Sequence, residues 1–226
     1  MKFMLTAAAA AAMSSAALAT FTGYSVSVAQ SAGGLTAYQL FANFNGATDT
    51  VLNAFEIHNT DGSGVIGGMY HADALNGGVS SNVAGTWNPQ FVLVPGAMDS
   101  WVCIGGGTGF ASGNSTAADP GWGAAGFNQA GIIDTADAGT AGWFNQNPPN
   151  LQGRVGVGPN TATGVLLGQF VMADSANMTL FLKIGYNNGV AGSAVQFGEG
   201  TFTLGVPTPG AIALLGLAGL AGRRRR

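Results

Sequence analysis

Residues 178–186 read MTLFLKIGY, and this stretch decides the fold class. Its apolar side chains recur at every second position, namely Met178, Leu180, Leu182, Ile184 and Tyr186. Thr179 and Lys183 fall on the opposite face. A period of two belongs to a β-strand, whose successive side chains point to opposite faces of the sheet. The stretch is therefore predicted to be a strand with one buried and one exposed face.

Several other short segments show a strand-like pattern. They are residues 25–28, 38–44, 51–57, 91–94, 101–104, 165–172, 195–197 and 201–204. Asn-Gly, Asp-Gly, Gly-Gly and Asn-Pro pairs, which favour turns, lie between them. No long stretch of residues 20–205 carries the apolar face of an amphipathic helix. We therefore expect residues 20–205 to form one all-β domain, an antiparallel, jelly-roll-like β-sandwich, of which residues 105–159 are the least regular part.

Charge and cysteine content exclude some classes of protein. The chain has 226 residues, of which 38 are glycine, 8% are charged and 47% are apolar, so a core can form. Residues 20–205 hold two basic residues, Arg154 and Lys183, against ten acidic ones, a net charge of −8. Nucleic-acid binding needs basic side chains that replace phosphate counterions, so that class is excluded. The single cysteine, Cys103, leaves no internal disulfide.

The first 19 residues have the pattern of a secretory signal peptide. Lys2 supplies a positive start, and residues 3–13 form an apolar helix of the usual length. Ala17 and Ala19 make an A-x-A cleavage site, so the mature chain is predicted to begin at Thr20. The protein is therefore expected to be exported.

Residues 206–226 form a tail with three parts. A short motif comes first, made of Val206, Pro207, Thr208, Pro209, Gly210 and Ala211. An apolar stretch ends at Gly222, and the last four residues are Arg223, Arg224, Arg225 and Arg226. A helix over the 14 residues 209–222 is about 21 Å long, whereas a bilayer core is about 30 Å thick. The tail is thus expected to be a short, transient inner-membrane anchor with its arginines on the cytoplasmic side.

The order of motif, short apolar helix and arginine cluster resembles the PEP-CTERM sorting signal, also known as the ice-binding protein C-terminal domain. Thr208 stands where that family usually has Glu. The resemblance implies recognition by an exosortase-type processing protease, removal of the tail, and delivery to the cell surface or the extracellular space. It also implies a setting of exopolysaccharide and biofilm matrix.

Four segments between the two ends resemble a second recurring domain. They are residues 38–42, 99–105, 142–144 and 164–170. The domain lies between signal peptide and sorting tail in many surface proteins, and it has no assigned activity. The resemblance agrees with a sandwich and implies no mechanism.

Several motifs have the residue types of a catalytic or cofactor site, but a simpler structural role is favoured for each. Residues 62–67 match G-x-G-x-x-G without a following helix, and a hairpin turn is favoured. Cys103 could act as a nucleophile with His58 or His71, yet a small buried residue in a strand is the simpler interpretation. No catalytic residue is assigned.

A structural role is also favoured for the carboxylates and possible metal ligands. Asp134 and Asp137 are close in sequence, but nothing pairs them across a sugar as a hydrolase requires, and a solvated loop is favoured. Asn59, Asp61 and Ser63 have the spacing of early calcium-loop ligands, although Tyr70 occupies the position of the bidentate Glu of an EF-hand. A turn is therefore favoured over calcium, and no metal site or cofactor is assigned.

The tryptophans carry the alternative function. Trp101 is expected in the core, whereas Trp122 and Trp143 lie in polar segments, where an exposed indole stacks on a sugar ring. The sequence thus predicts a non-enzymatic, exported surface or matrix protein. The first alternative is a carbohydrate-binding module for exopolysaccharide through Trp122 and Trp143, and the second is a secreted hydrolase.

Overall fold

The computed structural model describes residues 19–61, 69–71, 87, 98–106, 115–122 and 141–205. Ten β-strands and two short 3-10 helices (η) follow one another in this part of the chain. They are β1 (Phe21–Ala32), β2 (Leu35–Phe44), β3 (Thr50–Asn59), β4 (Met69–Tyr70), β5 (Trp101–Val102), β6 (Thr116–Ala118), η2 (Pro120–Trp122), β7 (Trp143–Asn145), η4 (Pro148–Asn150), β8 (Gly164–Ala173), β9 (Asn177–Asn187) and β10 (Gln196–Gly205).

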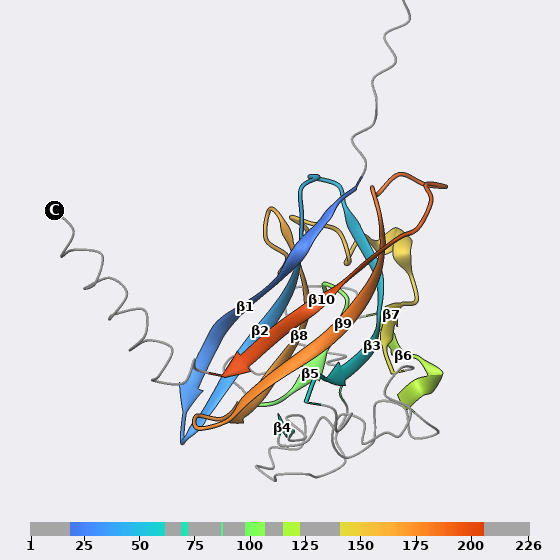
Figure 1. Ribbon diagram of the computed structural model, residues 1–226. Helices are drawn as coiled ribbons and strands as arrows, with labels where there is room; N and C mark the ends of the chain where they lie inside the picture. Colours follow the sequence, from blue (N-terminus) through green and yellow to red (C-terminus); the bar gives the residue numbers. More distant parts are fainter. Residues whose placement is uncertain are drawn as a thin grey trace, which may run out of the picture.

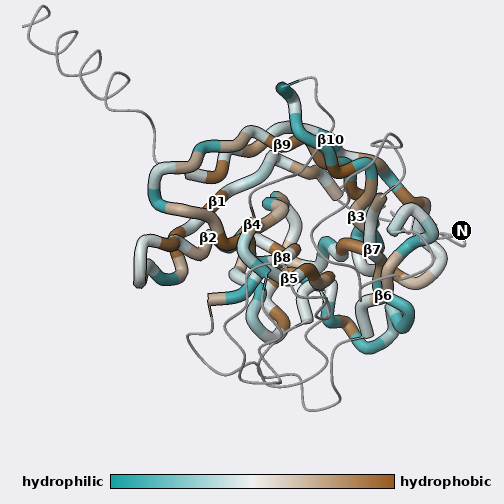
Figure 2. The backbone as a smooth tube through the Cα atoms, turned by 90° about the horizontal axis from the view of Figure 1, so that it is seen from below, coloured by the Kyte–Doolittle hydropathy of each residue, from teal (hydrophilic) through white to brown (hydrophobic). Residues whose placement is uncertain are grey.

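The strands form two antiparallel five-stranded sheets (Figure 1). The first sheet has the order β1-β2-β8-β4, and β5 also pairs with β8. The second sheet has the order β10-β9-β3-β7-β6. Seen from below (Figure 2), β9 and β10 run along the top of the view, and β8 and β5 lie beneath them near the centre. The all-β, sandwich-like prediction is confirmed at this level.

Two long hairpins shape the sheets. β1 and β2 are joined by Gly33 and Gly34, whose φ angles are +62° and +81°. Two consecutive positive φ values belong to the tight hairpin turn whose twist matches that of the flanking strands, and glycine adopts them without strain. The chain crosses between the sheets from β2 to β3 and from β8 to β9, and β9 returns to β10 within the second sheet.

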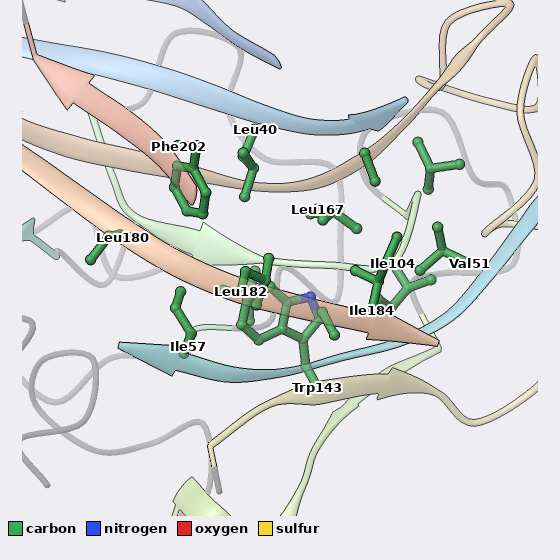
Figure 3. Close-up of a cluster of buried hydrophobic side chains, with 14 of the residues drawn as sticks. Leu40, Val51, Ile57, Ile104, Trp143, Leu167, Leu180, Leu182, Ile184 and Phe202 are labelled. Carbon is green, nitrogen blue, oxygen red and sulfur yellow. The ribbon is translucent and has the colours of Figure 1, made fainter. Parts of the chain in front are cut away.

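The core lies between the sheets (Figure 3). The first sheet contributes Leu40 and Leu167, and the second contributes Leu182 and Ile184, all of them fully buried. The even-numbered residues of 180–184 point inward, as their period of two predicted. Burial of this apolar surface is the main stabilising contribution to the fold, at about 25 cal/mol per Å².

β8 is buried on both faces, from Gly164 to Met172. One face contributes to the core between the sheets, and on the other Leu166 packs with Trp101 and Cys103 in a smaller cluster. The predicted burial of Trp101 is confirmed, since only 5% of it is exposed. Cover on both faces explains the nearly continuous apolar run of β8.

Three strand predictions differ from the structure. Residues 195–197 and 201–204 were predicted as separate strands, but β10 is continuous from Gln196 to Gly205. The strand predicted over residues 101–104 is shorter, because β5 ends at Val102.

The terminal helices lie outside the described residues, together with the sorting motif of residues 206–226 and Ala17 of the cleavage site. Ala19 and Thr20 are described, the first buried and the second exposed. The glycine motif of residues 62–67, the segment 91–94, and Asp134 and Asp137 are also outside. In the part of the chain that the structure describes, no helix is long and apolar enough to cross a bilayer.

Candidate functional site

The outer face of the second sheet carries a group of half-buried and exposed aromatic and charged side chains. We call this group the aromatic face, and it consists of Phe55, Glu56, His58, Phe181, Lys183, Phe197 and Glu199. Three neighbouring strands supply it, namely β3, β9 and β10. Because the core takes alternate residues of β9 and β10, the residues between them point to solvent.

Strand register brings these residues together. Lys183 on β9 pairs with Phe55 on β3 and with Glu199 on β10. Phe197 lies opposite Gly185, which has no side chain to meet it. The ring of Phe197 leans instead toward Phe55, with ring centroids 6.1 Å apart and planes at 87°. This edge-to-face geometry is a favourable one for aromatic pairs.

Phe197 is unusually open for a large apolar side chain, with 70% of it exposed. Val195, two residues earlier, is 49% exposed. A second aromatic pair lies farther along the same face, where the rings of His58 and Phe181 are 4.9 Å apart at 34°. Exposed apolar groups clustered in this way mark binding surfaces more often than isolated ones do.

An ion cluster lies between the two aromatic pairs. Lys183 Nζ is 2.6 Å from Glu56 Oε2 and 3.6 Å from Glu199 Oε2. It also lies 5.8 Å from the centre of the Phe181 ring. The hydrogen bond to Glu56 and the charges of both glutamates raise the pKa of Lys183 above its usual 10.5. The ammonium is therefore charged at all physiological pH values.

A backbone irregularity places Glu56 in this cluster. The pairing of β3 with β9 shifts between Phe55 and His58. Glu56 has a φ of +55°, one of two positive values at non-glycine residues in the described part of the chain. That conformation costs about 1–2 kcal/mol for such a residue. Strained backbone is common at functional sites, so Glu56 is a candidate ligand-binding residue.

The side chains of this face are of kinds that can contact a sugar. Aromatic rings stack against the C–H faces of sugar rings, and carboxylate and ammonium groups bond with hydroxyls. The two glutamates and one lysine carry a net charge of −1. The amino-acid sequence indicated this face only weakly. In a strand pattern, nothing distinguishes Phe55, Phe181 and Phe197 from apolar residues of the core.

Trp122 and Trp143 were the predicted sugar-stacking residues, and the structure buries both. Trp122 is 1% exposed and Trp143 0%. The indole N–H of Trp122 donates to the carbonyl of Gly142, and that of Trp143 donates to the carbonyl of Cys103 at 2.8 Å. The prediction that their faces are open to a sugar is wrong. Polar flanking residues suggested exposed loops, whereas η2 and β7 direct both rings into the core.

His71 belongs to a buried cluster rather than to an open site. Its Nδ1 lies 2.9 Å from Asp99 Oδ1 and 2.7 Å from the carbonyl oxygen of Ser100. The ring stacks on Trp87, with centroids 4.2 Å apart and planes inclined by 19°. Ser100 Oγ in turn donates to the Tyr70 carbonyl and accepts from the Val171 N–H at 2.8 Å. These contacts fasten the segments 69–71 and 98–100 to β8.

The structure separates Cys103 from the histidines considered as its partners. Cys103 Sγ donates to the carbonyl of Leu166 at 3.5 Å, in the small cluster outside β8. His58 lies on the outer face of the other sheet, and His71 is bonded as described above. Burial raises the pKa of the Cys103 thiol far above its usual value, which suppresses the reactive thiolate.

The calcium-like spacing forms a local turn where it is described. The side chain of Asn59 accepts from the N–H of Asp61 at 3.2 Å and donates to its carboxylate at 3.1 Å. Ser63 lies outside the described residues. Within the described segments, no group of three or more His, Cys, Asp or Glu residues is placed to hold a metal ion.

A separate groove of about 410 Å³ lies at one end of the sandwich. Its walls include Pro148, Pro149, Leu151 and Val190. Leu151 is 40% exposed and Val190 is 59% exposed. The groove lacks the charged side chains of the aromatic face, so we regard it as the weaker site.

Comparisons of the chain with protein-family models, with curated proteins and with solved structures give no match.

Proposed function

We propose that this chain is an exported, non-enzymatic protein of the cell surface or extracellular matrix, and that its sandwich binds neutral polysaccharide through the aromatic face. The binding function is inferred from one observation. Phe197 is 70% exposed and lies edge-on to Phe55, beside the ion cluster of Lys183 with Glu56 and Glu199. The fold is proposed to be jelly-roll-like in its finer topology.

Energetics favour a ligand on this face. Complete burial of a phenylalanine side chain contributes about 1.5–3 kcal/mol. Because Phe197 is 70% exposed, most of this stabilisation is not gained in the free protein. A sugar ring that covers it gains part of this energy on binding. The neighbouring charged groups already have partners, so they can orient hydroxyls without being left unpaired.

Charge selects the kind of polysaccharide. Residues 20–205 contain two basic against ten acidic residues, a net charge of −8. Lys183, one of these two basic residues, is engaged by two glutamates. An anionic polymer would meet a like-charged surface, and like charges oppose association. A neutral polysaccharide is therefore the proposed ligand.

Export and sorting are proposed on the pattern of the two ends. Residues 1–19 are proposed to direct secretion, with cleavage between Ala19 and Thr20. Residues 206–226 resemble a PEP-CTERM tail, which implies a transient inner-membrane anchor and an exosortase-type protease as partner. The exopolysaccharide-rich surroundings implied by that tail agree with a polysaccharide ligand.

Affinity electrophoresis tests the binding function. The purified protein is run through gels that contain a neutral glucan, a neutral mannan or an anionic polyuronate. We expect retardation by at least one neutral polymer and none by the polyuronate. Phe197→Ser should lower the affinity about fivefold or more, because it removes the most open ring of the face.

Val190→Ser is the matched control. Val190 is 59% exposed, but it lies in the loop between β9 and β10 and lines the groove instead of the aromatic face. It should leave binding unchanged, and both variants should melt close to the wild type, since exposed substitutions change stability by about 0.5 kcal/mol or less. Equal retardation of wild type and Phe197→Ser would exclude the aromatic face as the binding site.

Intact-mass analysis of the protein from its own host tests export and sorting. Loss of residues 1–19 and of the C-terminal tail is expected. Replacement of Arg223, Arg224, Arg225 and Arg226 by serine should leave the tail uncleaved. A full-length mass in the cytosol would contradict this part of the proposal.

A further inference from the structure

The free edge of the first sheet offers a second kind of contact. β1 pairs with β2 along one side, and within the described residues no strand pairs with its other side (Figure 1). The edge strand is 12 residues long and reads FTGYSVSVAQSA. An unpaired edge presents a row of backbone N–H and C=O groups that another strand can bond.

β1 has only part of the usual protection of an edge strand. Natural edges are blunted by charged side chains, especially lysine, by proline and by β-bulges, and β1 contains no charged residue and no proline. Pairing with β2 is irregular between Phe21 and Gly23 and again between Val28 and Gln30. Six residues from 23 to 28 remain regular between these two irregularities, enough to form a short strand pair.

The other sheet supports the start of β1 from one face. The ring of Phe21 packs over Gly198, and Tyr24 donates its hydroxyl to the carbonyl of Leu182 at 2.9 Å. Beyond this point Ser25, Ser27 and Val28 are not covered in this way, and Val28 is 62% exposed. The regular part of the edge is thus anchored at one end and open along the rest.

The side chains of one copy of β1 are complementary to those of a second copy. Ser25 and Ser27 lie on one face of the strand, whereas Val26 and Val28 lie on the other. When two copies of β1 pair antiparallel about a two-fold axis, the side chains on one face of the strand lie beside those on the same face of the other copy. Serine hydroxyls then meet serine hydroxyls, valines meet valines, and no like charges are opposed.

We propose that two copies of this chain associate by antiparallel pairing of their β1 strands, so that the first sheet continues from one copy into the other. This inference goes beyond the proposed polysaccharide binding and does not depend on it. The aromatic face belongs to the outer surface of the other sheet and stays open in the dimer. A dimer with two such faces would bind a repetitive polymer with avidity.

Cysteine cross-linking of the full chain in its host tests the pairing. Cys103 is the only cysteine and is buried, so an introduced thiol is the only accessible one. Ser25→Cys and Ser27→Cys are compared with Ser175→Cys, which lies in the exposed turn between β8 and β9. Antiparallel pairing brings like positions near the axis within disulfide distance.

We expect a disulfide-linked homodimer from Ser25→Cys or Ser27→Cys, at several times the yield from Ser175→Cys under mild oxidation. Equal yields from the three variants would overturn the proposal. A disulfide with a different protein would also overturn it, because the occupant of the edge would then not be a second copy.

A charge swap gives an independent measurement by sedimentation equilibrium of the purified protein. Ser27→Lys should weaken self-association about tenfold or more, since the axis brings two lysines together. An equal mixture of Ser27→Lys and Ser27→Glu should restore it. A wild-type protein that stays monomeric at millimolar concentration, or a dimer that Ser27→Lys leaves unchanged, would refute the pairing. Glycan retardation of the Ser27→Lys monomer reports separately on the aromatic face.

Discussion

Gly105 lies against the backbone of Gln152 so closely that a β-carbon on Gly105 would overlap the carbonyl oxygen of Gln152. The contact joins the segment after β5 to the segment before β8. The side chain of Gln152 strengthens the same junction, because its Nε2 donates to the Ile104 carbonyl at 2.9 Å and its Oε1 accepts from the Ser115 N–H at 3.0 Å.

Substitution of Gly105 by alanine should therefore lower the free energy of unfolding by more than about 2 kcal/mol, through backbone strain and overlap together. Gly33→Ala is the matched control. Gly33 has nearly the same φ, +62° against +63°, but nothing lies within 4 Å of its β-position. Urea denaturation of both variants separates strain from overlap. Equal losses would show that Gln152 imposes no steric limit.

Trp143 should behave as a core residue and not as a ligand contact. Trp143→Ala is expected to cost about 3–5 kcal/mol, because a fully buried ring leaves a cavity. Trp143→Phe keeps most of the volume and loses the hydrogen bond to the Cys103 carbonyl. At a temperature where it is folded, Trp143→Phe should bind polysaccharide as the wild type does. A selective loss of binding would restore Trp143 as a sugar contact.

Cys103 should resist thiol reagents in the folded protein. Burial raises its pKa, so the thiolate is scarce even at pH 9. Reaction with a chromogenic disulfide reagent should proceed at the rate of unfolding and become fast in guanidinium chloride. Rapid modification under native conditions would contradict the burial of this side chain.

Asp119 gives a pH dependence with a definite sign. Its partial burial raises the pKa of the carboxyl group above the usual 3.8, although the Gly121 N–H donates to it at 2.8 Å. The folded state thus holds the proton more tightly than the unfolded state. The protonated carboxyl of Asp119 therefore contributes to the free energy of unfolding at low pH, and this contribution is lost as the pH rises through the raised pKa. Asp119→Asn should remove that decline, which unfolding titrations from pH 3.5 to 7 would measure. Parallel curves for the two proteins would contradict the raised pKa.

Lys183 should matter more for binding than for folding. Lys183→Met keeps the apolar stem and removes the ammonium that Glu56 and Glu199 share. We expect polysaccharide affinity to fall about tenfold or more, the scale of one lost hydrogen bond to a charged group, while the melting temperature changes little. Because the pKa of Lys183 is raised, wild-type binding should persist through pH 9. Unchanged affinity would exclude the ion cluster from the site.

Only part of the aromatic face could be predicted from the sequence. Alternation along residues 178–186 identified β9 and its inward residues, so it also placed Lys183 on the outer face. It could not show that Phe197 pairs with Phe55, because that contact depends on the register of three strands and on the shift in β3 beside Glu56. For Trp122 and Trp143 the prediction was wrong, because their polar sequence neighbours indicated exposure. Both side chains are buried by packing against segments that are distant in the sequence.

β10 illustrates the same division within the fold. Gly198 and Gly200 interrupt its pattern, so the sequence suggested two short strands. In the folded protein the rings of Phe21 and Tyr24 pack over these glycines, and a β-carbon on Gly198 would collide with Phe21. The residues that look like breaks are the ones that allow β1 to approach β10.

The sequence by itself determined the strand-rich class and the inward residues of the long strands, because side-chain alternation is a local property of an extended backbone. It also determined the acidic character of the domain, which depends on composition alone. Only the tertiary structure decided which outward side chains gather into the aromatic face, which tryptophans are buried and which strand lies at the end of the first sheet. Those features arise from pairing and packing between segments far apart in the chain.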